Sequence, residues 1–366
     1  MKILLIYTGG TIGMVHDSES NAYVPFDFEN LQAQIPELQQ LDCTLEVQSY
    51  EPSIDSSNMQ PKIWVQLAET IEKFYKAYDG FVILHGSDTM AFTASALSFM
   101  LENLNKPVIL TGSQLPSGVP RTDAKENLIT AIEIAASGNT PEVCVYFEYK
   151  LLRGNRTVKV NAEHFEAFDS PNFPALAEAG GHIKYHQKVS CIIEKPLKVY
   201  EQMSASIALL KLYPGIPQEV VKAVLNSNCK GIVLETFGSG NASTHTEFLS
   251  VLESAIRNGK IILNISQCLA GAVSQGLYET SSQLEKIGVI SGKDMTTEAA
   301  LTKMMFLLAQ DLTVTKKDCD CKSRGSITLS EIIEGGNIIV SLSERALGRV
   351  VAADVKNPIS GEVVIK

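Results

Sequence analysis

The chain has 366 residues, of which 45% are hydrophobic and 20% charged, a composition typical of globular proteins that predicts about two domains. Its formal net charge is −10, and the sequence has no cluster of lysine or arginine residues that would form a basic patch. Neither nucleic acid nor a membrane surface is therefore an expected partner. The seven cysteines are odd in number and mostly far apart, which favours reduced thiols and a cytoplasmic location.

The chain opens with a short apolar run, Ile3–Tyr7, followed by a glycine-rich turn. The run predicts a strand buried on both faces, as in a parallel sheet covered by helices. Gly9 and Gly10 allow a tight turn at the carboxyl end of that strand, where open α/β sheets bind ligands, and Thr11 adds a hydroxyl there. The turn matches neither G-x-G-x-x-G nor a P-loop, which argues against a phosphate site. A purely structural turn stays open on this stretch alone.

From residue 60 onward, predicted helices and strands alternate, which favours parallel sheets. The first series is helix 61–80, strand 81–86, helix 89–104, strand 107–112, helix 123–138 with Asp123 as a candidate cap, and strand 142–149. The second series is strand 206–215, helix 217–227, strand 231–240, helix 244–259, strand 260–266 and helix 296–310.

The two series predict an α/β fold of two doubly wound domains, the larger one N-terminal. We expect an N-terminal catalytic domain at 1–190, a linker at 191–204, a C-terminal α/β domain at 205–310 and an atypical tail at 311–366. The site is expected at the carboxyl ends of the N-terminal parallel strands.

Metal-binding spacings are weak in this sequence. Cys319 and Cys321 form a C-x-C pair without a second Cys/His pair, and His182 and His186 stand four apart in a segment without helical period. No metal site is therefore predicted.

Polar residues also follow the predicted strand 81–86. Ser87, Asp88 and Thr89 come at its carboxyl end, so they and Thr11 can face one crevice. The alternative is structural, with Asp88 capping the next helix and Ser87 satisfying turn backbone. A threonine nucleophile needs a base, and a lysine oriented by a carboxylate can serve. Lys159 lies in an unusually polar stretch after a buried strand.

Several long motifs, in the order in which that family has them, resemble the bacterial asparaginases, and most closely their cytoplasmic, type I branch. The motifs are YTGGTIGM at 7–14, DSSNM at 55–59, LHGSDTMAFTASALSFML at 84–101, ILTGSQLP at 109–116, RTDAKENL at 121–128 and RGNRTVK at 153–159. The resemblance covers residues 1 to about 310. It implies hydrolysis of L-asparagine to L-aspartate and ammonia through a threonine acyl-enzyme, without metal or cofactor.

Through these motifs, the resemblance implies catalytic and binding roles for particular residues of this chain. Thr11 is the nucleophile, and Tyr23, on a mobile polar loop after it, orients that hydroxyl. Ser87, Asp88 and Lys159 supply a second hydroxyl, an acid and a base. The resemblance also implies that the α-amino and α-carboxylate groups of the substrate are held by Asp55, Ser56, Ser57, Ser87 and Asp88. The residues alone do not decide whether Thr11 or Ser87 attacks.

This sequence departs from the family at two places. Ser87 replaces the usual threonine, so its hydroxyl loses the β-methyl that stiffens χ1, and we expect a modest loss of rate. After Gln310 the tail instead resembles a stretch of the bacterial RNA polymerase β′ subunit without its catalytic motif.

The resemblance implies a homodimer or homotetramer in which FGSGNAST at 237–244 reaches towards a neighbour. Two other functions stay open. One is hydrolysis of a macromolecule-linked amide, as in the related subunit that acts on mischarged tRNA, and the other is amino-acid binding without catalysis.

Overall fold

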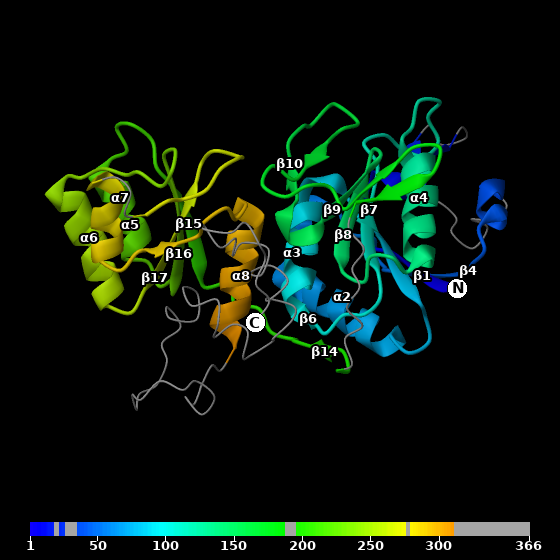
Figure 1. Ribbon diagram of the computed structural model, residues 1–366, viewed down its shortest axis with the longest axis horizontal. Helices are drawn as coiled ribbons and strands as arrows, with labels where there is room; N and C mark the ends of the chain where they lie inside the picture. Colours follow the sequence, from blue (N-terminus) through cyan, green and yellow to red (C-terminus); the bar gives the residue numbers. More distant parts are fainter. Residues whose placement is uncertain (18–21, 26–34, 187–194, 276–278, 311–366) are drawn as a thin grey trace. The chain divides into compact units, whose positions relative to one another are not determined.

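The structure is a computed structural model that describes residues 1–17, 22–25, 35–186, 195–275 and 279–310 (Figure 1). It divides into two compact units, Met1–Glu201 and Gln202–Lys366. The tail at 311–366 lies outside the described residues, as do Cys191, Cys319 and Cys321. The predicted fold class is confirmed, with a large, mostly parallel sheet in the first unit and a smaller sheet in the second.

The first unit is built on an eight-stranded sheet in the order β13-β12-β9-β8-β7-β5-β1-β4. Five neighbouring strands are parallel: β4 (Thr44–Ser49), β1 (Lys2–Tyr7), β5 (Gly80–Leu84), β7 (Val108–Thr111) and β8 (Val143–Phe147). Three antiparallel strands complete it: β9 (Lys150–Arg153), β12 (Ala177–Ala179) and β13 (Ile183–Tyr185). The smaller pairs are β2 (Met14–Asp17) with β3 (Ala22–Pro25), β6 (Leu101–Glu102) with β14 (Lys198–Val199), and β10 (Val158–Lys159) with β11 (Phe168–Asp169).

The strand order reverses direction at β1. The chain passes from β1 to β4 on one side and then returns to β5 on the other side of β1. Loops that leave the carboxyl ends of β1 and β5 therefore diverge and leave a crevice between them, which is the usual ligand position in such sheets. Both loops carry hydroxyl residues predicted to be functional, Thr11 and Ser87.

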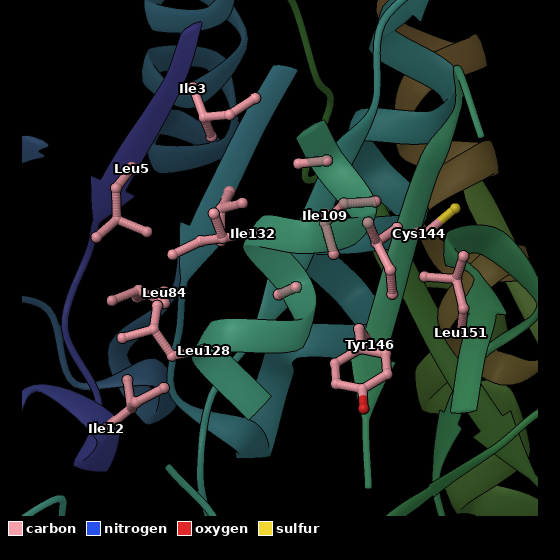
Figure 2. Close-up of a cluster of buried hydrophobic side chains, with 14 of the residues drawn as sticks. Ile3, Leu5, Ile12, Leu84, Ile109, Leu128, Ile132, Cys144, Tyr146 and Leu151 are labelled. Carbon is pink, nitrogen blue, oxygen red and sulfur yellow. The ribbon is translucent and has the colours of Figure 1, made fainter. Parts of the chain in front are cut away.

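Helix α4 (Ala124–Ser137) covers one face of this sheet, and Figure 2 shows the cluster that it forms. Leu128 and Ile132 of the helix pack with Ile3, Leu5 and Leu84 of the strands, all at most 3% exposed. Because side chains alternate along a strand, the neighbouring residues of β1 point to the opposite face, where α2 (Pro61–Phe74) and α3 (Met90–Met100) lie. Burial on both faces explains the uninterrupted apolar run of β1.

Two predicted helices end earlier than their sequence suggested. Helix α2 ends at Phe74, and Gly80 begins strand β5 instead of closing the helix. Lys106 explains the early end, because its Nζ donates to the carbonyls of Tyr75 and Tyr78, each at 2.5 Å, just after the last turn. Helix α3 ends at Met100, where the chain enters the short strand β6.

The second unit has a four-stranded parallel sheet in the order β15-β16-β17-β18, formed by Ile207–Lys211, Gly231–Thr236, Ile261–Ser266 and Ile290–Ser291. Its helices are α5 (Gln218–Leu225), α6 (Thr246–Arg257), α7 (Glu279–Lys286) and α8 (Thr297–Ala309). These strands follow one another in chain order without a reversal. The sequence did not predict α7, which is polar, or β18, which has two residues.

Candidate active site

Three loops of the first unit meet without room for side chains between them. A Cβ added to Gly10 would lie 2.5 Å from the backbone nitrogen of Gly86, and one added to Gly86 would lie 2.5 Å from Oγ of Ser56. A Cβ on Gly9 would lie 2.2 Å from the carbonyl oxygen of Ile54. The glycines are thus required for close approach, and they bring the loops after β1, β4 and β5 together.

Thr11 begins a short 3-10 turn, Thr11–Gly13, at the end of β1 and is half-buried. The loop before α4 holds this turn in place. Ser117 donates its backbone N–H to the carbonyl of Met14 at 3.0 Å and its hydroxyl to the carbonyl of Ile12. Thr8, the other threonine that flanks the glycine pair, is buried and donates its hydroxyl to the carbonyl of Leu84 at 2.9 Å. The Thr8 hydroxyl therefore makes a structural hydrogen bond.

Ser87, Asp88 and Lys159 are in contact, as the sequence predicted, although Lys159 lies 71 residues after Asp88 in the chain. Lys159 Nζ donates to Ser87 Oγ at 2.9 Å and to Asp88 Oδ1 at 2.7 Å. The Lys159 side chain is 18% exposed, whereas that of Asp88 is 66% exposed. The structural alternative for Asp88 is wrong, because the first turn of α3 has no side-chain cap and the Asp88 carboxylate binds Lys159.

Gln114, on the loop after β7, was missed by the sequence reasoning. Its Oε1 accepts the Ser87 hydroxyl at 3.2 Å, and its Nε2 donates to the carbonyl of His164 at 3.1 Å. The motif ILTGSQLP contains this residue, but a contact between side chains of two separate loops has no local sequence signal.

Asp123 has a different role from the predicted cap. Its carboxylate accepts the backbone N–H of Gln114 at 2.9 Å and that of Leu115 at 3.1 Å, and it makes no capping hydrogen bond to its own helix. The first free N–H of the helix, that of Ala124, is instead taken by the hydroxyl of Thr122 at 3.0 Å. Asp123 therefore fixes the loop that carries Gln114.

His85 lies directly under the Ser87 loop and is fully buried. Trp64 Nε1 donates to Thr93 Oγ1 at 3.0 Å, and Thr93 Oγ1 lies 2.9 Å from His85 Nε2. Since the Thr93 oxygen accepts from Trp64, its proton can point to Nε2, which leaves Nδ1 as the donor to the carbonyl of Gly86 at 2.7 Å. Burial lowers the pKa of His85 from 6.5 to about 4, so this ring is neutral at pH 7.

Of the predicted substrate-binding residues, Ser56 and Ser57 lie on the turn Ser56–Asn58 and Asp55 directly precedes it. Asp55 Oδ1 accepts the backbone N–H of Ser57 at 2.9 Å and its hydroxyl at 2.8 Å, and these bonds lower the pKa of the Asp55 carboxyl. Ser56 is 4% exposed and lies against Gly86, and its carbonyl accepts the hydroxyl of Thr89 at 2.7 Å. Asp55 and Ser57 are exposed, as a surface that meets a ligand requires.

Tyr23 lies on strand β3, where its backbone pairs with that of His16 on β2. Its side chain lies outside the described part of the structure, as does the tip of the loop at residues 18–21. Within the described residues, no group of three His, Cys, Asp or Glu side chains could hold a metal ion. None of the described helices is long and apolar enough to cross a membrane.

The fold and these contacts define a two-domain α/β protein with hydroxyl, amine and carboxylate groups at the switch point of its larger sheet. Two family models match the chain. The model described as "Asparaginase, N-terminal" matches residues 2–191, and "Glutaminase/Asparaginase C-terminal domain" matches residues 206–318. The chain therefore belongs to the asparaginase family, as the motifs predicted.

Individual relatives agree with this assignment. L-asparaginase 1 of Escherichia coli (strain K12) is 44% identical over 313 residues, which cover 85% of this chain and 93% of that protein. The crystal structure of L-asparaginase I from Vibrio cholerae O1 biovar eltor str. N16961 is 44% identical, with a TM-score of 0.79, and the match covers 85% of this chain and 93% of that one. The structure of the "Probable Cytoplasmic L-asparaginase from Campylobacter jejuni" is 29% identical with a TM-score of 0.69, covering 84% and 94%.

Proposed function

We propose that this protein hydrolyses L-asparagine to L-aspartate and ammonia through an acyl-enzyme on Thr11. The observation that carries the proposal is the contact of Lys159 with Ser87 and Asp88 beside the loop of Thr11. It joins a second hydroxyl, an amine and a carboxylate, the groups that a hydroxyl nucleophile requires for proton transfer. The names of the relatives agree with asparagine as substrate.

The reaction has two steps. The Thr11 oxygen attacks the side-chain amide carbon, the Thr11 proton is transferred to the leaving nitrogen, and the C–N bond breaks to release ammonia. Water then attacks the ester carbon, a proton from that water is transferred to the Thr11 oxygen, and the bond to Thr11 breaks as aspartate leaves. Ser87 and Lys159 pass protons in these steps, and Asp88 orients the lysine.

The same proposal assigns the remaining residues. Asp55 and Asp88 bind the substrate ammonium, and the hydroxyls and backbone N–H groups of Ser56, Ser57 and Ser87 bind its α-carboxylate. The exposed position of Asp55 and the hydrogen bonds from Ser57 that orient its carboxylate support this assignment. Tyr23 is assigned the role of orienting the Thr11 hydroxyl.

We also propose a cytoplasmic homodimer or homotetramer. The cysteine pattern and the name of the Campylobacter relative support the location. Phe237 and Leu269, which follow β16 and β17, are 36% and 59% exposed and support an interface at that edge of the second unit. The match to the asparaginase C-terminal domain extends to residue 318, beyond the expected end near residue 310. For the chain after residue 318 we keep the prediction of a polymerase-like segment that contributes no polymerase chemistry. Light scattering coupled to size exclusion measures the oligomeric state, and a monomer would contradict that part of the proposal.

Ammonia release tests the main proposal. The full chain is compared with Thr11→Ala on L-asparagine and L-glutamine at neutral pH. We expect turnover of asparagine that Thr11→Ala abolishes. Asparagine binding by the full chain without ammonia release would contradict the proposal and favour a non-catalytic binding protein.

A further inference from the structure

The hydroxyl of Ser87 has two hydrogen-bond partners of opposite kind, and together they fix its direction. Lys159 Nζ donates to the Ser87 oxygen at 2.9 Å, so that oxygen is the acceptor of this contact. The Ser87 proton therefore points to Gln114 Oε1, 3.2 Å away.

The orientation of the Gln114 amide follows from its second contact. Its other end lies 3.1 Å from the carbonyl of His164, and a carbonyl can only accept. The NH₂ group must face that carbonyl, which leaves the amide oxygen facing Ser87. The direction of the Ser87 proton thus follows from the Lys159 donor, the Gln114 amide oxygen and the His164 carbonyl together.

The backbone beneath Gln114 is held as firmly as its side chain. Asp123 is 6% exposed and accepts the N–H groups of Gln114 and Leu115, and Asn127 Nδ2 donates to the same carboxylate at 3.1 Å. Ser117, a few residues along the same loop, binds the carbonyls of Ile12 and Met14 beside Thr11. One loop therefore contacts both hydroxyl-bearing turns of the site.

We infer that Gln114 is a positioning residue that holds the Ser87 hydroxyl in line with Lys159. A serine lacks the β-methyl that restricts χ1, so its hydroxyl needs another restraint if its lone pair is to face the lysine. The amide oxygen of Gln114 supplies that restraint. This inference rests on the proposed function, in which Ser87 and Lys159 exchange protons during turnover.

A double-mutant cycle tests the inference. Gln114→Met keeps the length of the side chain but removes the acceptor. We expect it to lower kcat for asparagine about tenfold and to change KM less than about threefold, the loss expected for one neutral hydrogen bond. In a Ser87→Thr background the added methyl restrains the hydroxyl, so Gln114→Met should cost under about threefold. In a Ser87→Ala background it should cost nothing further.

Two controls separate positioning from stability. Gln66→Met, on the exposed face of α2, makes the same substitution outside the site and should leave kcat unchanged. Urea midpoints of all variants show whether folding is affected.

The outcomes distinguish this inference from the proposed function. An equal effect of Gln114→Met in the unmutated, Ser87→Thr and Ser87→Ala backgrounds would overturn the positioning role, while leaving catalysis itself established. No effect of Gln114→Met on kcat would overturn it as well. Absence of ammonia release from the unmutated chain would instead contradict the proposed function.

Discussion

Both sheets carry polar residues of the same kinds at the carboxyl ends of their parallel strands. The residues of the two sheets differ in their exposure and in their hydrogen-bond partners. At the edge of the first sheet, Lys159 donates to Ser87 and Asp88, and the latter side chain is 66% exposed. At the edge of the second sheet, Glu235 is 5% exposed, accepts the Thr297 hydroxyl at 2.6 Å and pairs with Lys211 at 3.1 Å.

Strand order explains the difference. The first sheet reverses direction between β1 and β5, so the loops leaving those strands separate and their side chains face a crevice. The second sheet runs in chain order, and polar residues near its strand ends bind one another. Thr236 of β16 donates to Asn264 of β17 at 2.7 Å, and Gln267, which follows β17, donates to the carbonyl of Leu212 at 2.6 Å. Polar residues at strand ends are therefore catalytic candidates only where the topology leaves them facing a crevice.

The largest effect is expected at the first edge, from Thr11→Ala. Removal of the nucleophile should lower kcat at least about 10⁴-fold, with little change in stability because the half-buried hydroxyl is not part of the core. The matched control is Thr8→Val. Thr8 is bound to the Leu84 carbonyl, so this variant should lose about 1 kcal/mol of stability and keep kcat within about tenfold. Equal losses of kcat in both variants, measured by ammonia release, would contradict distinct roles for the two threonines.

Lys159→Met comes next. It removes the amine from Ser87 and Asp88 and should lower kcat about 10²–10⁴-fold, the range for loss of a general acid–base group. Initial rates across a range of asparagine concentrations separate this from a binding defect. A rise in KM with unchanged kcat would mean that Lys159 binds substrate and does not transfer protons.

His85 makes the first unit sensitive to acid. Its folded pKa is about 4 and its ordinary value 6.5, so between these values the unfolded chain binds a proton that the folded chain does not. The free energy of unfolding should therefore decrease as the pH falls from 6.5 to 4, by up to about 3 kcal/mol. Urea midpoints measured across this range should fall less steeply for His85→Gln than for the unmutated chain. Identical slopes would show that His85 does not contribute.

Glu235→Gln tests the second edge. The variant keeps an acceptor for Thr297 but loses the charge that pairs with Lys211, which is 63% exposed, so we expect a loss of about 1 kcal/mol in the free energy of unfolding. Urea unfolding measures it. A loss larger than about 4 kcal/mol would show that the amide of the variant is buried without an adequate partner, and would weaken the contrast between the two edges.

Ser87→Thr should have the smallest effect. The added β-methyl restrains χ1 and restores the residue usual in the family, so we expect kcat to rise by no more than about threefold. Ammonia release from asparagine measures it. An increase of many orders of magnitude would show that Ser87 does not support turnover and that this chain is a degenerate member of its family.

The sequence was sufficient for the fold class because burial on both faces of a parallel strand leaves continuous apolar runs, as in β1 and β5. It failed where a long-range contact decided a boundary, as when Lys106 binds the carbonyls after α2. The motifs predicted the contact of Lys159 with Ser87. They did not predict Gln114, and the helix pattern wrongly predicted Asp123 as a cap. Both residues act across loops whose approach depends on the folded sheet.

Rapid acid quenching during asparagine turnover, followed by peptide mass spectrometry, tests the central claim most directly. The account predicts an aspartyl adduct on the peptide that contains Thr11, present in the full chain and absent from Thr11→Ala. Ser87→Ala should still form it, since in this account Ser87 transfers protons and does not attack. An adduct on Ser87 with none on Thr11 would contradict the assignment of the nucleophile.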